Sequence, residues 1–311
     1  MKTITKLIII FCILTLVSIY FSIPDPIRMS KIINLQCATE SINRFLGQKG
    51  NWQKIWPGNI YDSSTDNIFS NGDTVHVVAR LRNTIQVMVH HRGNLLPGSL
   101  IIIPLSIDSS KIEWRASMVS SMNPVMRIIR YRQARHINRM MIALIRQAKD
   151  FLEKKENLYG IPIEKISTKD TFLVATRGTY SSYPATADIY NLVGMLRKYI
   201  TDQNANVTGN PIMNVNQLDK AKYELMVAVP TNKELPGEKG IFFRRMVPGN
   251  FISTQVKGGN FSINNAFSGL QLYMEDYKKT RLAIPFMSLV TDRVTEPDTS
   301  KWITRIYFPS L

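Results

Sequence analysis

Residues 284–309 read IPFMSLVTDRVTEPDTSKWITRIYFP, and this stretch decides how the C-terminal half is interpreted. A Pro-x-Met motif at Pro285–Met287 follows a helical pattern, and an apolar residue before Pro309 closes the last strand. Both features occur once earlier in the chain, at Pro211–Met213 and before Pro230. Because the two features recur in the same order, they predict an internal repeat.

Each copy of the repeat is predicted to form a strand, a helix and two further strands. Apolar residues recur with a period of two in the strands and of 3.6 in the helices. The predicted segments of the first copy are Thr171–Thr179, Thr186–Asp202, residues 210–213 and Tyr223–Pro230, and those of the second are residues 242–256, 263–277, 284–287 and 304–309. Two such units can pair their sheets around a groove on a pseudo-twofold axis, which is a natural site for a small molecule.

The residues before the repeat, from about 29 to 160, are predicted to form one α+β domain. Thr39 is a good N-cap for a short helix, and Pro124 suits the first turn of a long helix that runs to about Glu156. Between the two helices lie four strand candidates, Thr74–Arg82, Thr84–His91, Ser99–Ile107 and Lys111–Ser120.

The composition is that of a globular protein. Of the 311 residues, 44% are hydrophobic and 20% are charged, which excludes disorder as the main state. Two cysteines exclude a disulfide scaffold and a Cys-rich zinc module. The adjacent His90 and His91 should point to opposite faces of a strand, so the pair cannot share a metal ion. With only four histidines in the chain, we predict no metal site, and we predict no cofactor.

The chain is strongly basic, with 39 Lys and Arg against 23 Asp and Glu. Many of these cations fall in the predicted long helix, where a solvated helix face is the favoured interpretation and a nucleic-acid or lipid-headgroup stripe is the alternative. Because the sequence has no helix-turn-helix, zinc-finger or RNA-binding signature, nucleic acid is not expected as a partner. Anionic lipid is the favoured alternative.

The N-terminal segment is interpreted as a membrane anchor. Residues 7–23 carry no charge, and Lys2 and Lys6 precede them. An uncleaved signal anchor is favoured over a cleaved signal peptide because no small-residue cleavage site follows. The expectation is therefore a transmembrane helix within residues 1–27, a single-pass membrane location and extracytoplasmic domains.

Residues 28–160 resemble the START-like, polyketide-cyclase-like (SRPBCC) helix-grip superfamily. The resemblance rests on the strand–helix opening, on the Trp-x-x-x-Trp-Pro-Gly element at Trp52–Gly58, and on Asn157–Gly160 after the long helix. It implies a curved sheet wrapped around the long helix, with an apolar cavity between them. Members of this family often act as scaffolds or lipid carriers.

Residues 168–311 resemble the GyrI-like, AraC effector-binding domain family. The most specific part is the tail at Thr291–Pro309, which is similar to the family's closing signature. The resemblance implies a duplicated domain that binds amphipathic, often cationic, small molecules in an aromatic groove. Some relatives hydrolyse reactive small molecules.

The sequence departs from that family at the position of its groove carboxylate, which Met287 occupies here. We expect Glu224 to substitute for it, on the strand face that also carries Met226 and Ala228. The repeat places Arg305 and Tyr307 in the corresponding strand of the second copy. These side chains could line one groove, or could equally form a solvent-exposed, salt-bridged sheet face.

Aromatic residues near the strand–helix junctions are candidates for the groove walls, because rings stack on organic ligands and attract cations. For any single ring an ordinary core position is the favoured alternative. With the strand residues, the complete set of candidate ligand-binding residues is Glu224, Met226, Tyr307, Arg305, Tyr180, Tyr183, Tyr190 and Phe267.

Together these features favour a membrane-anchored small-molecule-binding protein with an anchor at residues 1–27, a START-like domain at 28–160 and a GyrI-like domain at 168–311. The ligand is expected to be an amphipathic organic molecule. One alternative is a hydrolase of small reactive compounds that uses Glu224 and Tyr307. Another is a non-catalytic scaffold at the membrane surface. Binding is favoured over catalysis, and no catalytic residue is assigned.

Overall fold

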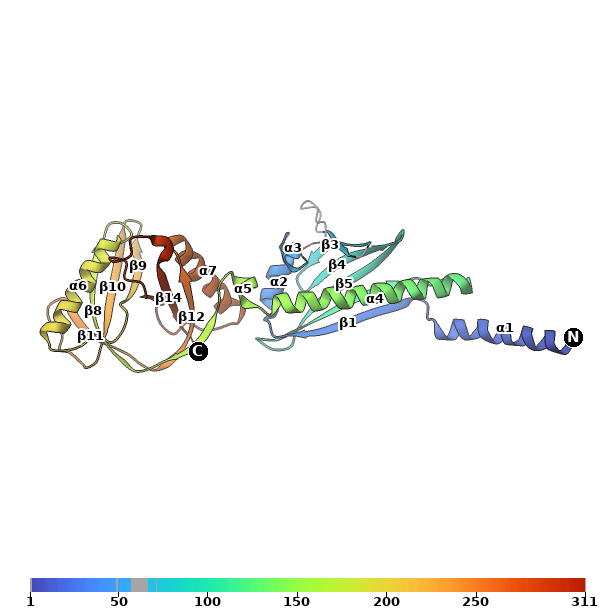
Figure 1. The fold of residues 1–311 in the computed structure, drawn as a ribbon, viewed down its shortest axis with the longest axis horizontal. Coiled ribbons are helices and arrows are strands. Elements are labelled where there is room, and N and C mark those ends of the chain that lie inside the picture. Colours follow the sequence, from blue (N-terminus) through green and yellow to red (C-terminus); the bar gives the residue numbers. More distant parts are fainter. Residues whose placement is uncertain (1, 49, 57–66, 71, 311) are drawn as a thin grey trace. The chain divides into compact units, whose positions relative to one another are not determined.

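The computed structural model describes all residues except 1, 49, 57–66, 71 and 311. The chain divides into two compact units, Met1–Lys154 and Lys155–Leu311 (Figure 1). Each unit is α+β and contains one antiparallel sheet. The boundary assigns the short helix α5, Lys155–Tyr159, to the second unit.

The first unit contains a six-stranded sheet and one long helix. The sheet has the order β1-β6-β5-β4-β3-β2. The elements are α1 Lys2–Ser22, β1 Ile27–Leu35, α2 Thr39–Gly47, α3 Asn51–Ile55, β2 Asn67–Ser70, β3 Asp73–Leu81, β4 Thr84–His91, β5 Asn94–Pro104, β6 Ser110–Met118 and α4 Pro124–Leu152. Helix α4 packs along β1 and β6 (Figure 1).

Helix α4 begins where Asn123 caps it. The Asn123 side-chain oxygen accepts hydrogen bonds from the backbone N–H groups of Val125, at 2.9 Å, and Met126, at 3.2 Å. Pro124 occupies the first helical turn, where the missing N–H costs nothing. A buried stripe at helical spacing then faces the sheet, formed by Ala134, Ile137, Met141, Leu144, Ile145 and Ala148.

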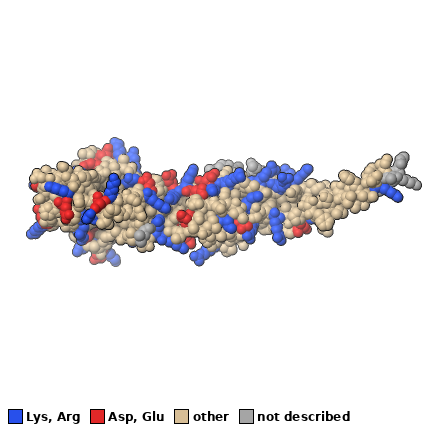
Figure 2. All heavy atoms as spheres, turned by 90° about the horizontal axis from the view of Figure 1, so that it is seen from below, with Lys and Arg blue, Asp and Glu red and all other residues tan. Residues whose placement is uncertain are grey.

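The basic residues of α4 lie mainly on its outer face, where Arg132, Arg135, Arg139 and Arg146 are exposed. Figure 2 shows Lys and Arg side chains over much of the face that it presents. Arg127 is the buried exception. Its Nε donates a hydrogen bond to the Ile23 carbonyl at 3.0 Å, and its guanidinium lies 4.8 Å from the Tyr20 ring centroid.

The prediction of an N-terminal transmembrane helix was wrong, and so was the membrane location that was inferred from it. Across the described residues, none of the helices combines the length and the apolar character that a bilayer crossing demands. The physical reason lies in the length of the apolar run. At about 1.5 Å per residue, residues 7–23 span about 26 Å, which is short of the roughly 30 Å hydrocarbon core.

The second unit contains an eight-stranded sheet in the order β11-β8-β10-β9-β13-β14-β12-β7. After α5 its elements are β7 Glu164–Thr168, β8 Thr171–Tyr180, α6 Thr186–Asp202, β9 Ile212–Asp219, β10 Lys222–Thr231, β11 Ile241–Met246, β12 Gly249–Lys257, α7 Asn260–Asp276, β13 Phe286–Leu289, the 3-10 turn η1 Thr299–Lys301 and β14 Ile303–Pro309. The six central strands are symmetric about the β9–β13 pair, since β8-β10-β9 is followed by β13-β14-β12.

The two faces of this sheet differ. Val174, Leu225 and Val227 alternate with the residues of the opposite face and are fully buried on the side that α6 packs against. The opposite face carries a small apolar cluster of Leu173, Ala175 and Ala228, with Ile212, Phe242 and Met246 packed against it.

One predicted strand is broken in the structure. Residues 242–256 were expected to form a single strand, but Val247 and Pro248 separate β11 from β12. Strand β11 pairs with β8 and strand β12 pairs with β14, so the two flank opposite halves of the sheet. Proline has no N–H for a ladder, which explains the break at this point.

The apolar stripe of α4 provides the first testable prediction. Ile137 is 0% exposed, whereas Ile129 on the same helix is 42% exposed. We expect Ile137→Ala to lower the free energy of unfolding by about 2–5 kcal/mol, because it leaves a cavity. The matched Ile129→Ala should change it by less than about 0.5 kcal/mol.

Urea denaturation followed by tryptophan fluorescence would measure both effects, since Trp52, Trp56 and Trp114 all lie in this unit. Equal losses in the two variants would contradict the orientation of the helix.

Candidate ligand-binding groove

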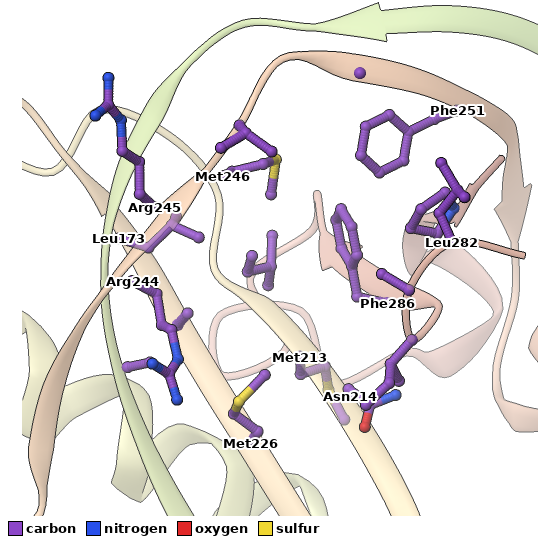
Figure 3. A pocket seen from close by; sticks show the side chains of 18 of the residues that line it. Leu173, Met213, Asn214, Met226, Arg244, Arg245, Met246, Phe251, Leu282 and Phe286 are labelled. Carbon is purple, nitrogen blue, oxygen red and sulfur yellow. The ribbon is translucent and has the colours of Figure 1, made fainter. Parts of the chain in front are cut away.

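The largely apolar groove of the second unit lies on the sheet face opposite α6 and has a volume of about 600 Å³. Both copies of the repeat contribute to it (Figure 3). Its floor is formed by Leu173 and Ala175 of β8, Met226 and Ala228 of β10, and Ile212 of β9. These positions share a face because each aligns with its neighbour in the ladder, as Ala228 does with Ala175 and Ile212.

Two connecting segments wall the groove. Residues 246–250, at the junction of β11 and β12, form one wall, and residues 282–284, which precede β13, contribute to another. Val247, Leu282 and Ile284 expose their apolar side chains there, with Val247 67% exposed. Exposed apolar residues gathered on one rim are a common mark of a binding surface.

The aromatic side chains of the groove come from the second copy. Phe286 and Phe251 line it, with ring centroids 5.9 Å apart and nearly perpendicular planes. Tyr307 stacks against Phe286 at 4.8 Å with an interplanar angle of 14°. The stacking holds the Phe286 ring, which Figure 3 shows beside the cavity.

The charged residues on the groove are both arginines. Arg244 and Arg245 line it, and the described lining residues include no Asp or Glu. Arg245 donates from Nε to Asp170 at 2.9 Å, and this hydrogen bond holds the pKa of Asp170 below its ordinary value. Arg244 lies 4.8 Å from the Phe242 ring centroid, and no carboxylate of the described chain forms an ion pair with it. The rim therefore carries a net positive charge.

The structure separates the predicted strand residues. Met226 lines the groove, whereas Glu224, two positions before it, lies 3.7 Å from Arg177 in an ion pair. Arg305 forms an ion pair with Glu164 across β12. Tyr307 is not itself a lining residue of the groove, but its ring packs against the lining rings of Phe286 and Phe251.

The predicted rings lie elsewhere in the unit. Tyr180 folds over Gly178, and burial raises the pKa of its hydroxyl. Tyr190 accepts a hydrogen bond from the Arg293 backbone N–H at 2.7 Å. Phe267 packs on Phe308 at 5.7 Å. These three positions are not among the groove residues of the described chain.

Tyr183 belongs to a second cavity of about 420 Å³, between the first turns of α6 and α7. Met213, Met287 and Trp302 line it, together with Arg293, whose guanidinium lies 4.4 Å from the Trp302 ring centroid. Burial raises the pKa of Tyr183 and lowers that of Arg293. This cavity is smaller than the groove, and a larger share of its lining is polar.

Sequence reasoning missed Phe251, Phe286 and Met246 as groove residues. The signal that could have found them is Val247-Pro248-Gly249, since a proline and a glycine inside an apolar run indicate a strand break. A break there turns the flanking residues into a wall of the groove.

No family model matches the chain, and no curated protein matches it. Among solved structures, the chain is similar to the C-terminal domain of EcmrR, with 16% identity and a TM-score of 0.43 over 49% of this chain and 98% of that one. SAV2435 bound to tetraphenylphosphonium gives 15% identity and a TM-score of 0.33 over 49% and 94%. A hydrolase from Listeria innocua gives 8% and 0.38 over 48% and 91%. Likenesses this distant assign no activity or ligand to the chain.

The Asp170–Arg245 pair predicts a pH dependence at the groove rim. Because the pKa of Asp170 is lowered in the folded chain, the pair stabilises the fold above the unfolded pKa, and this stabilisation is lost as pH falls through the folded pKa. A carbon-detected NMR titration should show the pKa of Asp170 rising toward its ordinary value in Arg245→Gln. An unchanged pKa in that variant would mean that another group holds the carboxylate.

Proposed function

We propose that the second unit is a small-molecule-binding module that takes an amphipathic organic ligand in the groove. The observation that carries the proposal is a 600 Å³ hollow with a floor of Leu, Ala, Ile and Met side chains and with arginines as its charged lining residues. Pockets of this size with few polar groups are typical of small-molecule sites. The amphipathic character of the ligand also agrees with the resemblance of residues 168–311 to effector-binding domains.

Burial of apolar surface supplies the driving force. Each methylene group removed from water contributes about 0.8 kcal/mol, and the exposed rim at Val247, Leu282 and Ile284 adds its own apolar surface. The ring of Phe286 is held by Tyr307, so little side-chain entropy is lost when a ligand packs on it.

The charge of the rim favours an anionic or neutral polar end on the ligand. A hydrophobic cation would need a nearby carboxylate, but Glu224 is engaged by Arg177 and Asp170 is engaged by Arg245. Arg244 is placed to meet a carboxylate or sulfate group at the mouth of the groove. The proposed ligand therefore has an apolar body and an acidic end, which departs from the cationic ligands that the resemblance implies.

A competition experiment tests this preference. The full chain would be loaded with the fluorescent anion 1-anilinonaphthalene-8-sulfonate and titrated with dodecanoate or with dodecyltrimethylammonium, two chains of matched length and opposite charge. We expect dodecanoate to displace the probe at lower concentration. Equal displacement by the two chains, or none by either, would refute the proposed charge preference.

Two variants place the binding in the groove. Arg244→Gln should weaken dodecanoate binding about two- to fivefold, the range of a solvent-exposed ion pair. Val247→Asp should weaken it further, since it puts an acid on the apolar rim without touching the core. Lys198→Gln and Met195→Asp make the same chemical changes on exposed positions of α6 and should leave the affinity unchanged. An unchanged affinity for dodecanoate in all four variants would place the ligand outside the groove.

The hydrolase alternative required Glu224 and Tyr307 in one groove. The structure gives both residues other contacts, Arg177 for the carboxylate and Phe286 for the phenol ring. No observation on the described residues favours a hydrolytic reaction over binding.

A further inference from the structure

Three metal-ligating side chains converge in the first unit, at a site that is separate from the groove. Asp73 opens β3, His91 closes β4, and His136 lies on α4. The Nδ1 atom of His91 lies 2.5 Å from Asp73 Oδ1, and the Nε2 atom of His136 lies 3.1 Å from Asp73 Oδ2. One ligand atom from each residue falls within 4.8 Å of the other two.

The fold brings these residues together from distant points in the sequence. Strands β3 and β4 form an antiparallel hairpin in which Thr74 pairs with His90, so Asp73 and His91 face each other at its open end. The imidazole rings of His91 and His136 have centroids 5.2 Å apart and an interplanar angle of 32°. Both rings therefore present a nitrogen to the same carboxylate.

The burial of Asp73 makes this arrangement unusual. Its side chain is 2% exposed, and its ion-pair partners among the described residues are the two histidines, with no lysine or arginine among them. A buried carboxylate is costly unless a positive charge compensates it. Neutral imidazoles donate hydrogen bonds but supply no charge, whereas a divalent cation supplies it fully.

We propose that Asp73, His91 and His136 form a binding site for a divalent transition-metal ion, with Zn²⁺ as the best match. Two imidazole nitrogens and one carboxylate oxygen are a ligand set that Zn²⁺ accepts, at bond lengths of about 2.0–2.2 Å. The His136 side chain is 40% exposed, so water can reach the fourth position.

The site has a matched control on the same strand. His90 is exposed and next to His91, but it points to the other face of β4. His90→Ala therefore removes an imidazole without touching the cluster, whereas His136→Ala removes a half-exposed ligand at little risk to the fold. Asp73→Asn keeps the shape of the carboxylate and removes its charge.

The test is a calorimetric titration of the tag-free, chelator-treated full chain with ZnCl₂, repeated with Co²⁺ to record the visible absorption of a tetrahedral complex. We expect one Zn²⁺ per chain in the parent and in His90→Ala, a rise in thermal stability on loading, and at least a tenfold loss of affinity in His136→Ala and Asp73→Asn.

Absence of stoichiometric binding by the parent chain would overturn the proposal and leave Asp73 as a hydrogen-bonded triad with the two histidines. Binding of equal affinity in His136→Ala would overturn it as well, because the ion would then lie elsewhere. The groove experiments use different residues in the other unit, so their outcome is independent of this one.

Discussion

The pairing of β9 with β13 is the constraint on which the second unit depends. These two strands meet at the centre of the eight-stranded sheet, where Met213 aligns with Met287 and Ile212 with Ser288. The ladder is short, but two further hydrogen bonds support it. Leu289 N–H donates to the Pro211 carbonyl at 2.9 Å, and the Asn214 amide donates to the Pro285 carbonyl at 2.7 Å. Both bonds tie the Pro-x-Met segment of one copy to its counterpart.

The same prolines explain why the repeat could be recognised from the sequence. Pro211 and Pro285 stand just before the strands that pair across the axis, where a proline does not interrupt a ladder. The helices α6 and α7 follow from apolar periodicity, as α4 does with its proline at the first turn. These elements are set by local patterns, so the sequence alone could predict them.

The groove and the histidine cluster were harder to predict because they depend on where distant segments meet. Residues 242–256 look like one strand in the sequence. Only the pairing of β11 with β8 and of β12 with β14 shows that the strand breaks at Pro248 and that the residues around the break line the groove. His136 is 63 positions from Asp73, and no spacing rule connects them. The prediction of a transmembrane helix at the N-terminus failed for a different reason. The absence of charge shows only that the segment is apolar, whereas a bilayer crossing also requires sufficient length.

In the proposed binding mode, charge pairing determines the preferred ligand charge more than the shape of the groove does. A face that carries both acids and bases could suit a ligand of either sign, but Glu224 and Asp170 each form an ion pair with an arginine. After these pairs are formed, Arg244 is the charge that remains at the lining. Counting charged residues along β8, β10 and β11 would not reveal this, because the balance depends on which partners the ladder places side by side.

The alternation of the central strands finally links the two hollows of the second unit. Met287 lines the cavity between α6 and α7, Ile212 and Phe286 line the groove on the other face, and Met213 lines both hollows. A shift of one residue in the β9–β13 register would exchange these sets and would bring Phe286 beneath the helices. The helix side already holds Arg293, whose guanidinium lies 4.4 Å from the Trp302 ring centroid and lines the same cavity as Met287, so a second large ring there would compete with it for space. The register at the axis therefore determines which face forms the proposed ligand groove.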